Sequence, residues 1–377
     1  MKNFFTLTVQ ICLFALFLMI GGMSSLYAAN RYAVANGNWN STSTWSASSG
    51  GGSGASVPVA GDNVYIERGY TVTVTANAAC SNLYFSTATT GNLGTLTINN
   101  GVTLTVSGEV TLNNAPSDDV SAIISGAGTL SCANLNIGND TEPSSSFGKT
   151  VVHSLTSTIN QLNISHNLTV KSRYTFFSLF IFSFYNYCNG IFIQDSGTVT
   201  VSGSVTIDNE NQENTSTLTL GNSSPTLNIA GATPFILSGK GKNNITLNGT
   251  GATVNYSGAA QQIRATTYTN LTLSGTGTKT FPSGTTTVNN VLSIENGTNT
   301  NTFTGTLAYG TSATLQYNAG TSNRTVSTEW PATFSSTGGV IVKGTGTITL
   351  NEAKTLGLSV PLNITAGATL ATSNYAM

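Results

Sequence analysis

Charged residues are scarce in this chain, and their scarcity excludes several classes of protein. Lys, Arg, Asp and Glu together make up 7% of the 377 residues, and the formal net charge is −1. Such a chain has no basic patch to neutralise phosphates, so we expect no nucleic-acid partner. The surface must be polar mainly through Thr, Ser, Asn and Gly. A net charge near zero gives little colloidal repulsion, which suits a protein anchored or assembled outside the cell.

Histidine and cysteine are also rare. The two histidines, His153 and His166, do not stand near a serine in a strand-to-helix elbow, and we expect both among turn residues. No Cys-x-x-Cys or Cys/His spacing indicates zinc. Cys80 and Cys132 share one local setting, each followed two residues later by Asn-Leu. This indicates either a disulfide or two small apolar residues in the same slot of successive coils, and the repeat favours the second.

Carboxylates are scattered rather than clustered, which argues against a polysaccharide lyase or hydrolase with grouped acidic residues. The nearest cluster runs from Asp208 to Glu213 and lacks the alternating ligands and turn glycine of a calcium loop, so a polar turn is favoured. We therefore predict no catalytic, cofactor-binding or metal-binding residues and no cofactor. A lyase or hydrolase is kept as the least favoured function.

The long apolar run at the start is short of the roughly 20 residues that span a bilayer. Lys2 precedes an apolar stretch from Leu7 to Ile20, and small residues follow at Ala28-Ala29. This pattern is typical of a signal peptide, and we predict one at 1–29, removed on export. The mature chain is then expected to be secreted or displayed on the cell surface, without a transmembrane helix.

After Asn30 the sequence alternates apolar residues with threonine in very short runs. Leu96-Thr97-Ile98 and Val102-Thr103-Leu104-Thr105-Val106 are examples, and Asn, Gly and Ser separate such units. Threonine is β-branched, so it suits a strand while its hydroxyl faces water. The alternation predicts strands with one buried face and one solvated face.

Longer segments also recur, which indicates a repeat architecture. Gly251–Tyr256 is echoed by Ser312–Tyr317, and Gly275–Phe281 by Gly344–Leu350. The sequence predicts an all-β fold, a right-handed parallel β-helix (β-solenoid), because the strands are short and inward positions are mostly Val, Ile and Leu. Tandem β-sandwich repeats remain the alternative. We expect N-terminal capping and first coils over 30–115, and solenoid repeats over 116–377.

An aromatic-rich stretch within 171–194 does not follow the threonine alternation. Tyr174–Tyr185 is dense in Phe and Tyr, and Asn186 interrupts it before a membrane span could form. An apolar loop against the solenoid, an interaction patch and a local error in the gene model all remain open.

Tryptophans give the one ligand-like signal. Exposed Trp39, Trp45 and Trp330 could stack on sugar rings, and their neutral polar surroundings suit neutral glycans. Alternatively, Trp39 and Trp45 plug the open end of the first coil, and this capping role is favoured.

The stretch from Asn36 to Val74 carries a resemblance. Gly37-Asn38-Trp39, Ser43-Thr44-Trp45 and Pro58-Val59-Ala60-Gly61-Asp62 resemble the start of the eight-glycine extracellular β-domain family. The block Val254–Ile263 with Tyr268–Gly275, and the segment 315–370, resemble repeats of large surface proteins of Bacteroidetes-type bacteria.

The resemblance implies an adhesin-like β-helix and no catalytic residues. It also implies a C-terminal sorting domain, whereas this sequence reaches Met377 within a repeat. A periplasmic location is expected if no such domain follows. We predict a non-enzymatic structural or adhesive extracellular protein whose partners are surface glycans or matrix proteins. A carbohydrate-binding module is the alternative.

Overall fold

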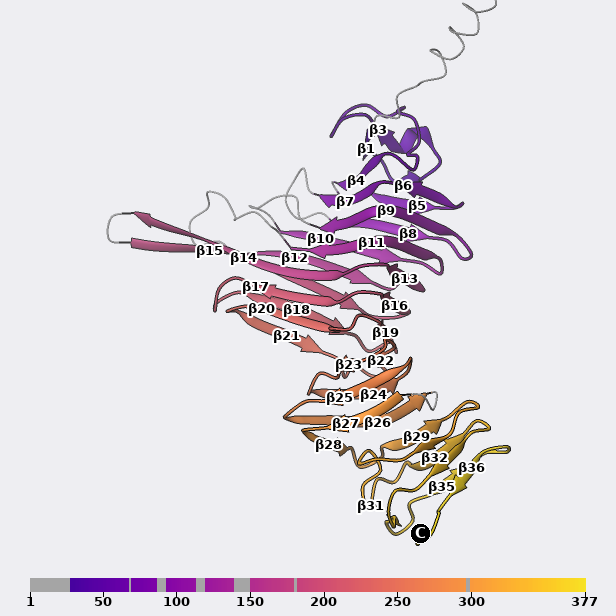
Figure 1. The fold of residues 1–377 in the computed structure, drawn as a ribbon. Helices are drawn as coiled ribbons and strands as arrows, with labels where there is room; N and C mark the ends of the chain where they lie inside the picture. The colour runs from indigo at the N-terminus through magenta and orange to yellow at the C-terminus, as the bar shows by residue number, and fades with distance from the viewer. Residues whose placement is uncertain are drawn as a thin grey trace, which may run out of the picture.

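The computed structural model describes residues 28–67, 69–86, 93–112, 119–138, 150–179, 182–295 and 299–377. This part of the chain is all-β, with 36 strands and a single 3₁₀ turn, Thr42–Thr44. The strands wind into a long, mostly parallel β-solenoid (Figure 1). The predicted parallel β-helix is confirmed, and the tandem-sandwich alternative is wrong because its strands would be antiparallel. The core of the predicted signal peptide lies outside the described residues.

The solenoid has three faces in its first section, and the strands of each face stack in parallel from coil to coil. Face 1 consists of β1 (Asn30–Ala33), β4 (Asn63–Glu67), β7 (Asn82–Ser86), the second half of β9 (Thr103–Leu112), the second half of β11 (Thr129–Ile137), β14 (Leu168–Leu179), β17 (Val205–Asn209) and β20 (Phe235–Gly239).

Face 2 continues through almost the whole molecule. It consists of β6 (Ala78–Cys80), the first halves of β9 and β11, β13 (Gln161–Ile164), β16 (Thr198–Val201), β19 (Thr226–Ile229), β22 (Thr253–Tyr256), β24 (Thr267–Leu273), β26 (Thr285–Glu295), β29 (Thr314–Asn318), β32 (Gly339–Lys343) and β35 (Leu362–Ile364).

Face 3 closes the coils of the first section. It consists of β2 (Gly37–Asn38), β5 (Thr71–Val74), β8 (Leu93–Ile98), β10 (Val120–Ser125), β12 (Thr150–Ser157), β15 (Phe182–Gln194), β18 (Thr215–Leu220) and β21 (Lys242–Thr246). Coils on both sides of the predicted boundary at 115 belong to the same ladders, since β9 pairs with β11.

Smaller parallel ladders complete the coils after Tyr256. They are β23 (Gln261–Gln262), β25 (Gly277–Phe281) and β27 (Asn299–Phe303); β28 (Thr306–Tyr309) on β26; β30 (Arg324–Thr325), β33 (Thr347–Thr349) and β36 (Thr369–Ala371); and β31 (Thr333–Phe334) with β34 (Thr355–Leu356). Figure 1 shows a waist at β22 and β23 between the two sections.

The core is built from in-register columns of apolar side chains. On face 2, Leu104, Leu130, Leu162 and Val199 stack one above another and are fully buried. Burying each such side chain contributes roughly 1.5–3 kcal/mol, so the column is a main source of stability. The threonines that alternate with them point outward, as the period-2 pattern predicts.

The core of the second section adds large aromatic rings to the predicted Val, Ile and Leu. Tyr256, Tyr268, Tyr317 and Phe281 are fully buried there. The hydroxyl groups of Tyr256 and Tyr268 lie 2.8 Å apart and hydrogen-bond to each other. Mutual hydrogen bonding allows these polar rings to fill the interior.

Asparagines at the coil corners tie each coil to the next. The Oδ1 atom of Asn77 accepts the Thr103 N–H at 2.9 Å, and that of Asn167 accepts the Ser204 N–H at 2.8 Å. Glycine is needed where coils approach closely. Gly126 has φ +109°, and a Cβ there would lie 2.1 Å from the Ile98 carbonyl oxygen. These contacts explain why Asn and Gly separate the strands.

The predicted atypical segment forms a β-hairpin. Strands β14 and β15 pair antiparallel from Arg173–Cys188 to Leu179–Phe182, and the hairpin projects from the side of the solenoid (Figure 1). Its inner ends stay in the coil, where β14 pairs with β17 and β15 with β18. The aromatic side chains of 174–186 lie outside the described residues. Among the described residues, no helix has the length and apolarity to cross a bilayer.

Candidate functional site

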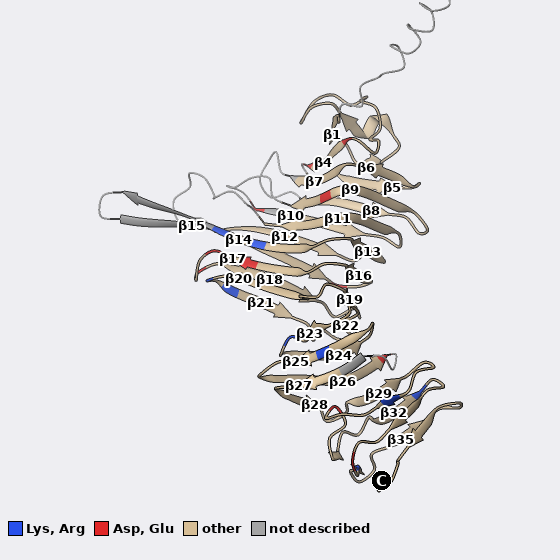
Figure 2. Ribbon diagram, viewed as in Figure 1, with Lys and Arg blue, Asp and Glu red and all other residues tan. Residues whose placement is uncertain are grey.

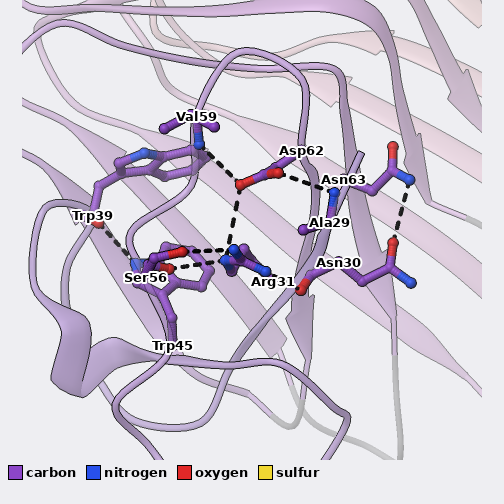
Figure 3. Close-up of polar contacts among 9 residues, drawn as sticks. All are labelled: Ala29, Asn30, Arg31, Trp39, Trp45, Ser56, Val59, Asp62 and Asn63. Carbon is purple, nitrogen blue, oxygen red and sulfur yellow. Dashed lines mark hydrogen bonds and ion pairs between the residues drawn. The ribbon is translucent and has the colours of Figure 1, made fainter. Parts of the chain in front are cut away.

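The N-terminal cap is organised by Asp62, from the Pro-x-x-Gly-Asp turn (Figure 3). Its Oδ2 atom accepts the Val59 N–H at 3.1 Å, and its Oδ1 atom accepts the Ala29 N–H at 3.0 Å. The Arg31 Nε atom lies 3.8 Å from Oδ2 and donates to the Ser56 carbonyl oxygen at 2.9 Å. The carboxylate thus joins its own turn to the N-terminal segment that contains Ala29 and Arg31, and Arg31 extends the contact to Ser56.

The three tryptophans considered as sugar-stacking residues are enclosed. Trp39 is 3% exposed, and Trp45 and Trp330 are fully buried. Trp39 and Trp45 pack edge to face in the cap, and the Trp45 Nε1–H donates to the Trp39 carbonyl oxygen at 2.7 Å (Figure 3). Trp330 stacks on Tyr317 in the second section. None of the three rings offers a face to a sugar, and the cap position of Trp39 and Trp45 agrees with the capping interpretation.

A tyrosine stack that the sequence interpretation missed lies on the outside of face 1. The rings of Tyr32 and Tyr65 stack with centroids 4.6 Å apart, and those of Tyr65 and Tyr84 with centroids 4.8 Å apart. Because the rings cover one another, the inner ring faces are not available to a ligand. The signal was the recurrence of Tyr at one outward position in three paired strands.

Cys80 and Cys132 are free thiols, so the disulfide alternative is wrong. Both point inward in one column of face 2, with Val106 between them. They therefore share one slot, two coils apart rather than in adjacent coils. Burial raises the pKa of each thiol to about 12.

A polar cluster lies in the interior where the hairpin leaves the coil. The Cys188 Sγ atom lies 3.6 Å from the His153 Nδ1 atom, and both residues are fully buried. The Ser172 and Ser216 hydroxyls lie 2.7 Å apart. A thiol beside an imidazole can act as a nucleophile and its base, but only where a substrate reaches it. This pair is fully buried, so we interpret the cluster as part of the packed interior of the solenoid.

The placement of the histidines corrects the expectation of two turn residues. His153 is an inward residue of β12. His166 does lie in a corner turn, with the Ser165 hydroxyl 3.2 Å from its Nδ1 atom. The inward positions of Val151 and Leu155, on either side of His153, were the signal for the strand.

Within the Asp208–Glu213 segment, residues 210–213 form the predicted polar turn, whereas Asp208 and Asn209 are the last residues of β17. Asp208 pairs with the Arg173 guanidinium at 2.8 Å and accepts a hydrogen bond from the Ser238 hydroxyl at 2.5 Å. Across the described ranges, no three His, Cys, Asp or Glu residues lie close enough together to hold a metal ion.

An open groove of about 510 Å³ runs along the outward surface of face 2 and its corner with face 1. Thr105, Ser131, Asn163 and Thr200 line it from four successive coils, since each pairs with the next. Serines at the corner complete the wall together with Val106, Cys132, Ala133 and Ile164, and no lining residue is charged. Its volume is within the range of small-molecule binding sites, about 300–1,000 Å³.

The polar groups in the middle of the groove are free. Within the described part of the chain, the side chains of Thr105, Ser131 and Asn163 make no hydrogen bond to protein. One coil beyond Asn163, Thr200 Oγ1 accepts a hydrogen bond from the Asn228 amide at 3.3 Å. The groove therefore presents hydroxyl and amide groups that a ligand can engage.

Comparison with known proteins identifies no relative. No protein-family model, curated protein or solved structure matches the chain.

Proposed function

We propose that this chain is a non-enzymatic extracellular protein of structural or adhesive type that binds a neutral glycan in the face 2 groove. The observation that carries the proposal is the free amide of Asn163 at the centre of an uncharged groove. An amide offers both donors and acceptors, and it can pair with sugar hydroxyls.

The shape of the groove supports an extended ligand. Neighbouring coils are about 4.8 Å apart, so four coils place polar side chains along about 15 Å. A polymer lying parallel to the solenoid axis meets one such side chain per coil. Stacked coils fix the spacing between these residues before binding, which lowers the entropic cost of association.

Export and surface display belong to the same proposal. The signal-peptide pattern and the resemblance of Asn36–Val74 to extracellular β-domains support them. The low charge of the surface also suits a protein that assembles outside the cell.

A glycan array tests the proposal. We expect the parent chain to be retained on neutral glycans, such as glucans, mannans or xylans, and not to prefer polygalacturonate or alginate. Incubation of the chain with the glycan that it binds should release no shorter products. Absence of retention on every neutral glycan would refute glycan binding, and release of products would refute the non-enzymatic assignment.

A further inference from the structure

The waist of the molecule leaves two of the three faces without a continuation. Face 2 continues from β22 to β24, whereas face 1 ends at β20 and face 3 at β21. Among the described strands, β20 pairs only with β17, and β21 only with β18. Each of these last strands therefore has one unpaired edge at the waist (Figure 1).

The free edge of β20 carries backbone groups that can pair with another strand. The Lys240 N–H donates to the Asn209 carbonyl oxygen at 2.7 Å, on the side of β17. In a parallel ladder alternate residues point to opposite edges, so the N–H groups of Phe235, Leu237 and Gly239 face away from β17. An unpaired row of this kind is a template for an added strand.

The apolar core is open at the same place. Leu237 pairs with Ile207, which is fully buried, so Leu237 occupies an inward position; it is nevertheless 41% exposed. Its neighbour Ile236 is 40% exposed on the other side of the strand. Leu237 also lines a hollow of about 460 Å³, together with Pro234 and Pro282. Solenoid ends need a cap, and here the second section covers only part of the first.

Basic side chains lie at both ends of this edge. Arg264 lines the hollow beside Phe235 and Leu237. Its Nε atom is shielded from water and has no hydrogen-bond partner among the described residues. Lys240 and Lys242 follow the other end of β20 and are exposed. None of the three has an ion-pair partner in the described part of the chain, and Figure 2 shows basic segments at β21 and β23.

We propose that the waist docks an extended peptide strand of a partner protein, apolar in its middle and acidic at both ends. The strand adds to β20 through backbone hydrogen bonds, as in β-augmentation. Its apolar side chains cover Leu237, and its carboxylates reach Arg264 at one end and Lys240 and Lys242 at the other. A second copy of this chain is disfavoured, because symmetric pairing of two such edges would bring like charges together.

Fluorescence anisotropy tests the docking with a labelled heptapeptide, Asp-Asp-Val-Thr-Val-Asp-Asp, and a matched peptide with Lys in place of Asp. We expect the intact chain to bind the acidic peptide and not the basic one. Arg264→Gln and Leu237→Asp should each weaken binding about tenfold or more, whereas Lys343→Gln on β32 removes a remote charge and should not. Leu237 is already partly exposed, so its variant is expected to fold, which circular dichroism verifies.

Hydrogen exchange adds a readout at the strand itself. Bound peptide should slow exchange at the Leu237 and Gly239 amides. Two binding results would overturn the proposal: no binding of the acidic peptide, or equal binding of the acidic and basic peptides. A third is that the chain forms a dimer in the absence of peptide and that Leu237→Asp dissociates this dimer. Asn163→Leu in the glycan groove should leave peptide binding unchanged, so the two sites succeed or fail separately.

Discussion

Asn163 and Thr200 occupy paired positions in adjacent coils, yet their side chains do not hydrogen-bond to each other. Thr200 instead accepts from Asn228 on its other side, which leaves the Asn163 amide facing the groove. In the later coils of face 2, the outward polar side chains hydrogen-bond to one another from coil to coil. In the earlier coils, the corresponding side chains have no such partner among the described residues. This difference distinguishes the groove from the rest of a uniform surface.

The buried tryptophans should affect stability rather than glycan binding. Trp45→Ala removes a fully buried ring and its 2.7 Å hydrogen bond to Trp39, so we expect a loss of about 3–5 kcal/mol in the free energy of unfolding. Trp45→Phe should lose less. Urea unfolding measures both. Glycan binding lost at unchanged stability would contradict the capping role.

Corner asparagines should contribute modestly and locally. Asn167→Ala removes the acceptor of the Ser204 N–H, and we expect a cost of about 0.5–1.5 kcal/mol and faster hydrogen exchange at Ser204. Asn167→Asp keeps an acceptor oxygen and serves as the control. Unchanged exchange at Ser204 in the alanine variant would count against this role.

Lys279 should make stability depend on pH. Its ammonium group is fully buried, where it donates to the carbonyl oxygens of Gly258 and Ala259 and to the Gln261 side chain. Burial lowers its pKa from 10.5 to about 8. Between these values the unfolded chain holds a proton that the folded chain has released, so stability rises with pH across this window.

We expect this rise to approach about 3 kcal/mol in the parent chain, from the size of the pKa shift. Urea unfolding at several pH values from about 7 to about 10.5 measures it. Lys279→Met removes the titrating group and should flatten the dependence, whatever its effect on absolute stability. Parallel curves for parent and variant would show that other groups cause the rise.

The thiols of Cys80 and Cys132 should be unreactive in the folded protein. Burial raises the pKa of both to about 12, so almost no thiolate forms near neutral pH. Iodoacetamide should modify them only after denaturation, as peptide mapping can verify. Modification of the folded chain at the unfolded rate would mean that the interior opens readily.

The architecture was readable from the sequence because period-2 alternation marks inward residues directly. The echo of Gly251–Tyr256 in Ser312–Tyr317 also anticipated a shared position, since Val254 and Leu315 lie in one column of face 2. His153 could have been placed from the same alternation. The tryptophans were harder to place, because an aromatic ring beside polar residues fits a surface or a cap equally well.

The groove and the waist could not be read in this way. Asn163 and Asn228 both occupy outward positions of face 2 strands. Which of the two amides hydrogen-bonds to the protein depends on the residues in the neighbouring coils. Leu237 likewise resembles every other inward residue of face 1. Its exposure arises because no described strand pairs with β20 on the side away from β17, and this depends on how the later coils are built.

The central claim is that the face 2 groove binds a neutral glycan through Asn163. Affinity electrophoresis tests it most directly, in gels that contain the glycan to which the parent chain binds on the array. Asn163→Leu keeps the branched shape of the side chain but removes its hydrogen-bonding groups, and Asn244→Leu makes the same change on exposed face 3. We predict that the Asn163 variant loses about tenfold in affinity while the Asn244 variant matches the parent. Equal retardation of both variants would contradict the account.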